Sequence, residues 1–314
     1  MRIGIIVDST CDLPHSFIEQ HGIVLLPISI SLDGETFVDT RDPAATAAYY
    51  QGDMGKRGHA AETASYSVEQ ISDLFLSRLV LDYDCVFCLT VTASRSPIHA
   101  NASKASFAIL KQYRPIRERA DIHSPFLMRV IDTQNLFAAQ GVTAVEAARM
   151  VAAGASPGRI RERLEVLAGH TWGYCVPRDL YYLRARAKKK GDHSVGMFSA
   201  VLGSALDIKP ILQCHRGETQ AVGKLRGYDA ATQALFDYTA ERVRAGLLTR
   251  TLCVSFGGDL AELETLPGYA QLAQACAQHD TTLYASTMSI TGMVNLGIGT
   301  VSLGFAAEDH EVKF

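Results

Sequence analysis

The sequence predicts an α/β protein with two domains. In the first half, short apolar runs alternate with stretches of helical periodicity, which is typical of βαβ units and of a mostly parallel sheet flanked by helices. After residue 170 the order becomes mixed and a hairpin appears, which indicates a second α/β domain with a mixed sheet. A chain of 314 residues is also longer than one hydrophobic core usually serves. We therefore expect domains at residues 1–170 and 171–314.

The elements of the first half follow from their apolar patterns. A continuous apolar run predicts a buried strand at residues 3–7, and Asp12 is placed to cap a helix that starts near Leu13 and ends at Gly22. The elements after this helix are, in order, a strand at 23–32, a turn at Asp33-Gly34 into 35–38, a helix with a loop at 40–58, a helix at 68–79, a strand at 84–91, a helix at 97–113, a strand at 127–132, a helix ending near Gly154 and a helix at 156–169.

The second half mixes hairpins with longer helices. Pro210 lies in an extended stretch at 208–212 and favours an edge strand, because proline donates no backbone hydrogen bond. The other elements are a strand at 171–176, helices at 179–190 and 192–206, a hairpin turn at 216–218, a helix at 229–246, a strand at 250–255, a helix at 259–279 interrupted at Pro267-Gly268, and strands at 282–285 and 300–305.

Two polar turns, at residues 62–67 and 92–97, are each expected to open a helix. Ser67 with Gln70 forms a capping-box pattern before an apolar periodic stretch. Ser96 followed by Pro97 is typical of an N-cap and a first helical residue, since proline there loses no needed hydrogen bond. Helix starts carry unpaired N–H groups and a partial positive charge, so hydroxyls beside two of them suit an oxygen anion. Thr63 and Ser96 are our candidates for holding an anion, with helix capping as the alternative.

Polar residues also follow several strands predicted in the first half. Asp8 and Ser9 follow the first strand, Thr92 and Ser96 follow a later one, and Asp132 ends the last. In a parallel sheet these positions share one edge, which is where such sheets bind ligands. We therefore expect a site at this edge. For Asp8 and Asp132 the alternative is that they only accept hydrogen bonds from loop N–H groups.

Composition argues against several classes of protein. The net charge of −3 gives no electrostatic reason to expect a nucleic-acid partner. No apolar run approaches the length needed to cross a bilayer, and the N-terminal apolar run predicts a strand and not a signal peptide. We expect a cytoplasmic protein.

The cysteines and histidines do not predict a metal site. The seven cysteines lie in apolar surroundings, as reduced core cysteines do. Cys85 and Cys88 form a C-x-x-C inside a predicted strand, where their side chains would point to opposite faces. The histidines lack the spacing of metal ligands, and the sequence has neither a phosphate-binding loop nor a G-x-S-x-G elbow. We expect no metal, no cofactor and no hydrolytic triad.

The order of motifs along nearly the whole chain resembles the DegV family. The family opening D-S-T-x-D-L-P is matched at residues 8–14, and its L-G-x-L-L-N-I-K-P-I segment is resembled at residues 202–211. Thr63 and Ser67 fall on the ends of its T-S-Q-P-S motif, and Ser96 matches the serine of S-S-x-L-S-G-T that bonds a lipid carboxylate. Further similarity lies at Leu26-Pro27-Ile28-Ser29-Ile30 with Asp33-Gly34 and Asp39, at Ile131-Asp132-Thr133 and at Lys224-Leu225-Arg226.

The resemblance implies a lipid-binding function. DegV proteins bind a long-chain fatty acid in an apolar tunnel between their two domains, which would place the carboxylate here at Thr63 and Ser96. Ser65, Thr92 and Asn295 would be its neighbours, with Asp8, Ser9 and Asp132 as loop support. Members act as the lipid-carrying subunit of bacterial fatty acid kinase, in which a separate ATP-binding subunit phosphorylates the bound carboxylate. The implied role is that of a non-catalytic subunit.

The sequence also departs from the family pattern. Pro97 replaces a glycine, Ala64-Ser65-Tyr66 replaces S-Q-P, and Asn295 replaces a histidine, so the headgroup loses a group that could carry a proton's charge. The family's G-G-R-I motif is absent, and a basic run at 184–190 occupies that region; it predicts a solvated helix end, with docking on a kinase or transient membrane contact as the alternative. Two other functions therefore stay open: a stand-alone phosphotransferase or hydrolase acting on a lipid-like acid, and a lipid sensor without a kinase.

Overall fold

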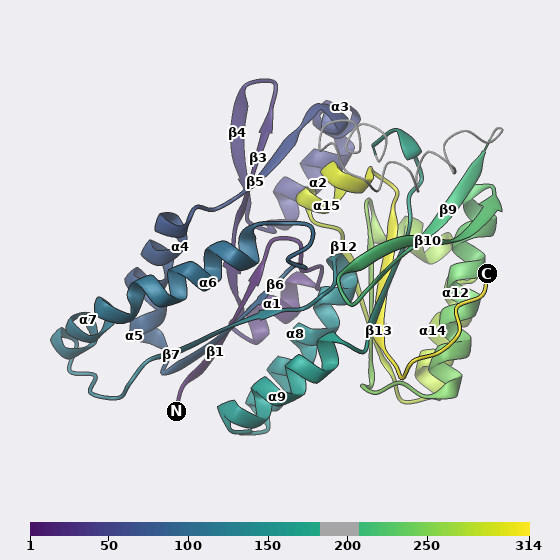
Figure 1. The fold of residues 1–314 in the computed structure, drawn as a ribbon. Coiled ribbons are helices and arrows are strands. Elements are labelled where there is room, and N and C mark those ends of the chain that lie inside the picture. The colour runs from purple at the N-terminus through teal and green to yellow at the C-terminus, as the bar shows by residue number, and fades with distance from the viewer. Residues whose placement is uncertain (183–206) are drawn as a thin grey trace.

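A four-stranded parallel sheet forms the core of the N-terminal half (Figure 1). The computed structural model describes residues 1–182 and 207–314, so the helix predicted at 192–206, most of the one at 179–190 and the basic run lie outside the described residues. The strand order is β2-β1-β6-β7, and every neighbouring pair runs parallel, as predicted. Its strands are β1 (Ile3–Asp8), β2 (Val24–Leu26), β6 (Cys85–Thr90) and β7 (Leu127–Asp132).

The single strand predicted at residues 23–32 is wrong, because the chain changes sheet at Pro27. Proline has no N–H to donate, and the pairing of β2 with β1 ends at Leu26. The chain then enters an antiparallel three-stranded sheet of order β4-β3-β5, which projects beyond the parallel sheet at the top of Figure 1. Its strands are β3 (Ile28–Leu32), β4 (Glu35–Asp39) and β5 (Glu62–Ser65).

A six-stranded mixed sheet lies in the C-terminal half, with the order β10-β9-β8-β13-β11-β12. Only the β11–β12 pair is parallel. The predicted hairpin turn is confirmed, since Arg216 and Gly217 both have positive φ between β9 and β10. Its strands are β8 (Thr171–Val176), β9 (Ile208–His215), β10 (Glu218–Arg226), β11 (Thr251–Phe256), β12 (Thr282–Thr287) and β13 (Val301–Ala306).

The edge position predicted for Pro210 is wrong. β9 is an interior strand that pairs with β10 on one side and with β8 on the other. Proline is tolerated there because the β8 register starts only at Leu212, so Pro210 has a strand neighbour on one side alone.

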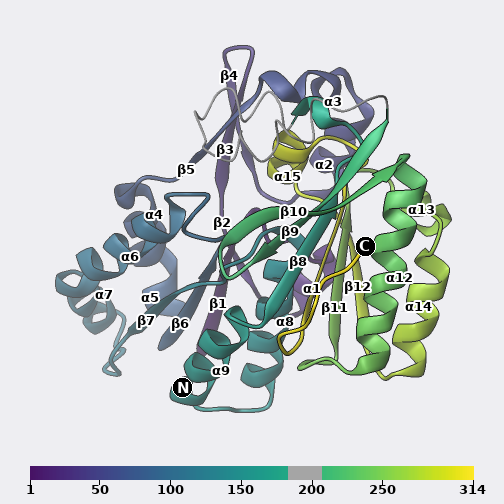
Figure 2. The same cartoon turned by 45° about the vertical axis from the view of Figure 1, so that its right-hand side comes forward.

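The helices cover both faces of both large sheets. Helices α4 and α6 pack on one face of the parallel sheet, α8 and α9 fill the space between the two sheets, and α12 and α14 cover the outer face of the mixed sheet (Figure 2). The helices are α1 (His15–Gln20), α2 (Pro43–Gln51), α3 (Asp53–Arg57), η1 (Gly58–Ala60), α4 (Val68–Leu74), η2 (Phe75–Leu79), α5 (Val80–Asp82), α6 (Ile98–Ala108), η3 (Ile109–Lys111), α7 (Tyr113–Arg119), α8 (Phe137–Ala152), α9 (Pro157–Ala168), α12 (Tyr228–Ala245), α13 (Leu260–Thr265), α14 (Tyr269–Gln278) and α15 (Ile290–Leu296).

Helix boundaries were predicted well where local chemistry sets them. Both hydrogen bonds of the capping box between Ser67 and Gln70 are present at the start of α4. The predicted interruption at Pro267-Gly268 separates α13 from α14. The helix cap predicted at Asp12 is wrong: α1 begins at His15, and the Asp12 carboxylate instead forms a buried ion pair with Arg41.

Helix α8 links the two sheets. Residues from Phe137 to Ala148 are all buried, and they contact β1 and β6 on one side and β8, β11 and β13 on the other. Small side chains allow this close approach: Ala139 lies against Gly173 of β8 and Gly304 of β13, where a Cβ would overlap it.

In the described part of the chain, no helix has both the length and the apolar character that crossing a bilayer requires.

Candidate functional site

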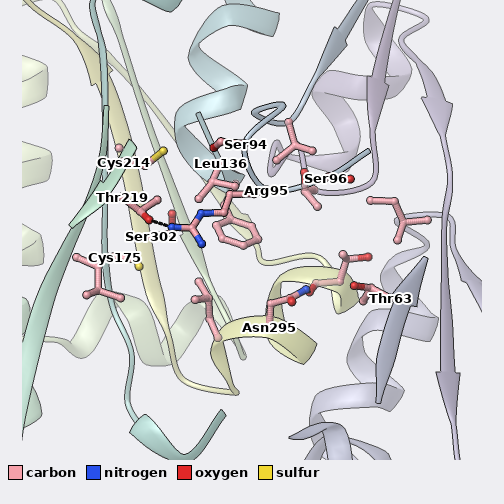
Figure 3. A pocket seen from close by; sticks show the side chains of 18 of the residues that line it. Thr63, Ser94, Arg95, Ser96, Leu136, Cys175, Cys214, Thr219, Asn295 and Ser302 are labelled. Carbon is pink, nitrogen blue, oxygen red and sulfur yellow. Dashed lines mark hydrogen bonds between the residues drawn. The ribbon is translucent and has the colours of Figure 1, made fainter. Parts of the chain in front are cut away.

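A cavity of about 600 Å³ lies between the N-terminal loops and the mixed sheet (Figure 3). This volume is within the range of ordinary small-molecule sites. Both halves of the chain build its wall. The lining residues are Thr10, Ile28, Thr63, Ala64, Ser65, Val91, Ser94, Arg95, Ser96, Pro97, Leu136, Phe137, Gly173, Tyr174, Cys175, Leu212, Gln213, Cys214, Thr219, Gln220, Thr291, Asn295, Leu296 and Ser302.

Thr63 and Ser65 reach the cavity because β5 is a strand. The polar turn predicted at residues 62–67 is wrong in its first part: residues 62–65 pair with β3, with Thr63 opposite Ile30 and Ser65 opposite Ile28. Alternate residues of a strand share a face, so both hydroxyls point to the same side while Glu62 and Ala64 are exposed. Sheet pairing, and not a helix start, therefore places Thr63.

Ser96 lies in the loop between β6 and α6. Helix α6 begins at Ile98, one residue later than predicted, and the Ser96 hydroxyl accepts a hydrogen bond from Ile98 N at 3.3 Å. The hydroxyl therefore sits beside the start of an eleven-residue helix while also lining the cavity. Both hydroxyls singled out from the sequence, those of Thr63 and Ser96, face the same cavity (Figure 3).

The loop that carries Ser96 is held to the rest of the protein by hydrogen bonds to backbone carbonyl groups. Thr92 N donates to Asn135 O at 3.0 Å, and Ser94 Oγ donates to Gly217 O in the hairpin turn of the mixed sheet. Thr92 itself is buried beneath the loop and is not a lining residue, although it was expected to neighbour a headgroup. Thr10, just after β1, lines the cavity instead.

The strand-end residues Asp8, Ser9 and Asp132 lie behind the cavity and not in its wall. The Asp8 carboxylate accepts bonds from Val91 N at 2.6 Å and from Thr10, so it ties two strand-end loops together. Burial raises the pKa of the Asp8 carboxyl, although these hydrogen bonds oppose the change. Ser9 Oγ accepts from Ile28 N, and Asp132 accepts from the backbone N–H groups of Ala93 and Gln134. All three side chains bond loop backbone.

Asn295 reaches the cavity from the C-terminal helix α15. Its amide donates to Thr291 O at 2.7 Å, one turn earlier in the helix. Thr291 in turn bonds Asp39 through both its N–H and its hydroxyl, which seats α15 against the three-stranded sheet. Asn295 and Thr63 therefore line the same cavity, as Figure 3 shows.

Sequence reasoning missed the wall made by the mixed sheet and by Arg95. Arg95 immediately precedes Ser96, and its guanidinium extends across the cavity to donate to the hydroxyl of Thr219 on β10 (Figure 3). Arg95 lies inside the polar turn at residues 92–97, so its position in that turn could have marked it as a lining residue. Cys175, Cys214 and Ser302 carry no motif, and only the strand register brings them to the same face of the sheet.

Few titratable side chains line the described part of the cavity wall. Burial raises the pKa of the Cys175 and Cys214 thiols to about 12, so neither is a thiolate at neutral pH. Among the described lining residues, Arg95 alone carries a formal charge, and none is a carboxylate or a histidine that could act as a general base. The hydroxyls of Thr63 and Ser96, together with apolar side chains such as that of Leu136, can hold a molecule with a polar head and an apolar chain.

Fold and cavity together define an α/β protein with a ligand pocket between a parallel and a mixed sheet. The sequence model described as "Uncharacterised protein, DegV family" matches residues 2–308. A DegV domain-containing protein of Xanthomonas axonopodis pv. citri is 57% identical over 310 residues, which cover 99% of each chain. The chain therefore belongs to the DegV family.

Two more distant relatives are named for the ligand that they bind. A fatty acid-binding protein of Thermotoga maritima is 27% identical over 267 residues, which cover 85% of this chain and 86% of the relative. The crystal structure of a stearic acid-binding protein from Eubacterium ventriosum superimposes with a TM-score of 0.77 at 20% identity and covers 97% of this chain and 98% of that one. This likeness confirms the predicted two-sheet α/β fold.

Proposed function

We propose that the protein binds a long-chain fatty acid in the cavity between its two sheets, with the carboxylate held by the hydroxyls of Thr63 and Ser96. The observation that carries the proposal is that these two side chains, from elements far apart in sequence, line one cavity together with apolar residues. Relatives that bear the names fatty acid-binding and stearic acid-binding protein support this class of ligand.

The energetics assign different roles to the two ends of such a ligand. A buried methylene contributes about 0.8 kcal/mol, so a long acyl chain supplies roughly 10 kcal/mol before association entropy is subtracted. A hydrogen bond to a carboxylate contributes about 1.5–3 kcal/mol when water is excluded. The tail therefore sets the affinity, and the hydroxyls of Thr63 and Ser96 fix where the headgroup lies.

Removing either hydroxyl should weaken fatty acid binding by about ten- to a hundredfold without unfolding the protein. Ser96→Ala and Thr63→Val remove the hydroxyls at nearly constant volume. We expect both variants to co-purify with less lipid, measured by mass spectrometry of solvent extracts, and to bind added acid more weakly in calorimetric titrations.

Ser103→Ala provides the matched control, because Ser103 lies on the same helix α6 but does not line the cavity. It should leave lipid content and affinity unchanged. Equal affinity in the parent, Ser96→Ala and Thr63→Val would contradict the proposed carboxylate site.

We further propose that the bound carboxylate is presented to a separate ATP-dependent kinase subunit, which forms the acyl phosphate. The absence of a phosphate-binding loop from the sequence supports a division of labour between lipid carrier and kinase. The protein would be mixed with a bacterial fatty acid kinase subunit, ATP and fatty acid, and acyl phosphate trapped with hydroxylamine. Product that requires both proteins supports the proposal. ATP turnover by the isolated chain would favour a stand-alone enzyme, and no product at all would favour a lipid sensor.

A further inference from the structure

Arg95 brings a positive charge to the part of the cavity that lies at the mixed sheet. Arg95 directly precedes Ser96 in the loop between β6 and α6, but its guanidinium donates to the hydroxyl of Thr219 on β10. Figure 3 shows this side chain directed toward the mixed sheet, away from Ser96 and Thr63. The two consecutive residues therefore reach different parts of one cavity.

The strand register confirms that the guanidinium lies at the inner face of the mixed sheet. Thr219 pairs with Cys214, and Cys214 pairs with Gly173, which faces Ala139 of α8. Paired residues of neighbouring strands share a face, and both Thr219 and Cys214 line the cavity. Burial raises the pKa of the Cys214 thiol to about 12, and the positive charge of Arg95 opposes this rise. Both observations place the charge at the inner face.

A ligand in the cavity meets a positive charge at this part of the wall. Arg95 alone carries a formal charge among the lining residues that the structure describes. The carboxylate of Asp132 also acts on the Cys214 thiol, but it accepts hydrogen bonds from the N–H groups of Ala93 and Gln134 and does not line the cavity. A hydrocarbon chain laid against a guanidinium takes charge out of water and offers no hydrogen bond in return, which is unfavourable.

We propose that, at equal chain length, the cavity prefers a dicarboxylic acid to a monocarboxylic acid, with the second carboxylate bound by the guanidinium of Arg95. The inference rests on the proposed fatty acid function and deepens it, because it names the kind of acid that the same cavity selects. Thr63 and Ser96 hold the first carboxylate. A guanidinium presents its N–H donors as a planar fork that binds a carboxylate through two parallel hydrogen bonds. The bond to Thr219 holds this fork at the wall.

The separation of the two carboxylate sites sets a minimum length for such an acid. The Cα atoms of Arg95 and Ser96 are about 3.8 Å apart, as in any consecutive pair, and their side chains diverge from there. An acid too short to reach from the Ser96 hydroxyl to the guanidinium can use only one site. The preference should therefore appear above a certain chain length and be absent from the shortest acids.

The test compares saturated dicarboxylic acids, from hexanedioic to octadecanedioic acid, with monocarboxylic acids of the same carbon number. Affinities are measured by calorimetric titration of delipidated protein at neutral pH, where both carboxyl groups are ionised. We expect at least one dicarboxylic acid to bind about tenfold more tightly than the matching monocarboxylic acid in the parent protein.

Two variants of Arg95 separate its charge from its shape. Arg95→Met should remove the preference and strengthen binding of the monocarboxylic acids, because their chains then meet an apolar side chain. Arg95→Lys keeps the charge but not the planar fork, so it should retain an intermediate preference. Both variants should fold, since the bonds of Thr92 and Ser94 that hold the loop are unchanged.

Arg159→Met is the matched control, because it removes the same charge from an exposed position on α9 that does not line the cavity. It should retain the full preference. Monocarboxylic acids that bind as tightly as every dicarboxylic acid in the parent would overturn this inference alone, as would a preference that survives in Arg95→Met. A parallel loss of both classes in Arg95→Met would place the guanidinium at the first carboxylate and would also overturn it. Failure of both classes to bind the parent would overturn the proposed function as well.

Discussion

At the scale of single residues, Asp84 shows how neighbours decide what a side chain does. Its carboxylate precedes β6 and accepts bonds from Arg2 N at 2.9 Å, Arg117 Nη2 at 2.8 Å and Ser124 Oγ at 3.0 Å. Burial raises the pKa of the Asp84 carboxyl, but these hydrogen bonds outweigh burial and hold the pKa well below its ordinary value. Arg117 is 1% exposed, so this carboxylate is the counter-charge of a buried guanidinium.

Asp84→Asn should lower the free energy of unfolding by about 3 kcal/mol at pH 7, because it leaves the buried Arg117 without its anion. A depressed folded-state pKa stabilises the protein above the unfolded-state pKa of about 4, and this stability is lost as pH falls through the folded-state value. The difference between parent and variant should therefore shrink below about pH 4. Urea unfolding at pH 7, 5 and 3 measures it.

Asp82→Asn serves as the control, because Asp82 pairs with Arg78 on an exposed helical face. It should change stability by less than about 0.5 kcal/mol at any of these pH values. A pH-independent loss in Asp84→Asn would show that the ion pair is not the cause.

At the scale of elements, the sequence predicted those whose signals are local. The capping box fixed the start of α4, and Pro267-Gly268 ended α13. The prediction that the C-x-x-C lies in a strand was also correct, because Cys85 and Cys88 of β6 pack in different core clusters on opposite faces of the sheet. The strand at 23–32 was predicted wrongly because its apolar pattern continues through Pro27 while its hydrogen-bond partners change from one sheet to another.

The packing of α8 on β13 gives a prediction at this scale. A Cβ on Gly304 would lie 2.2 Å from Ala139 Cα in α8, which is far inside contact distance. Gly304→Ala should therefore push the helix off the sheet and destabilise the protein by about 2–3 kcal/mol. Thermal and urea unfolding would measure the loss.

Gly158→Ala is the matched glycine control in α9, where an added Cβ meets nothing within 4 Å. Because glycine is a poor helix former, this variant should be neutral or up to about 1 kcal/mol more stable. Equal stability of the two alanine variants would contradict the close contact between α8 and β13.

At the scale of the whole molecule, a buried polar network joins the two halves of the chain. Arg41 Nη1 bonds Asp12 Oδ1 at 2.9 Å, and a second guanidinium nitrogen donates to Thr287 O at the end of β12. Asp12 also accepts from Ser255 Oγ and from Ser289 N. These bonds hold the loops of the parallel sheet against the C-terminal half. We propose that the two domains divide near residue 170. Helix α8, which lies before this boundary, packs against the sheets of both domains.

Arg41→Met should cost about 3–5 kcal/mol, because it leaves the Asp12 carboxylate buried without a cation. Asp12→Asn in the same chain should recover part of that loss, since the unpaired charge is then removed. A double-mutant cycle by urea unfolding measures the coupling, expected at about 1–3 kcal/mol.

Lys56→Met removes an exposed cation paired with Asp53 and should have almost no effect. Strictly additive losses in the Arg41 and Asp12 variants would show that this ion pair does not join the halves.

The candidate site was predicted in part. Thr63, Ser65, Ser96 and Asn295 were named from the sequence, and all four line the cavity. Hydroxyl-rich motifs at strand and helix ends can be recognised locally. The opposite wall was missed because Cys214 and Ser302 lie 88 residues apart (302 − 214) on strands that are not neighbours in the sheet.

The sequence by itself determined the alternation of strands and helices, some helix ends such as the start of α4 and the end of α13, and the family to which the chain belongs. These features depend on hydrogen bonds and apolar patterns within a few neighbouring residues, and such local signals do not depend on how the rest of the chain folds. Only the tertiary structure decided that Asp12 pairs with Arg41, that residues 23–32 divide between two sheets, and that the mixed sheet faces Thr63 and Ser96 across the cavity. Each of these features depends on which distant strands pair, and the burial of the whole hydrophobic core determines that pairing.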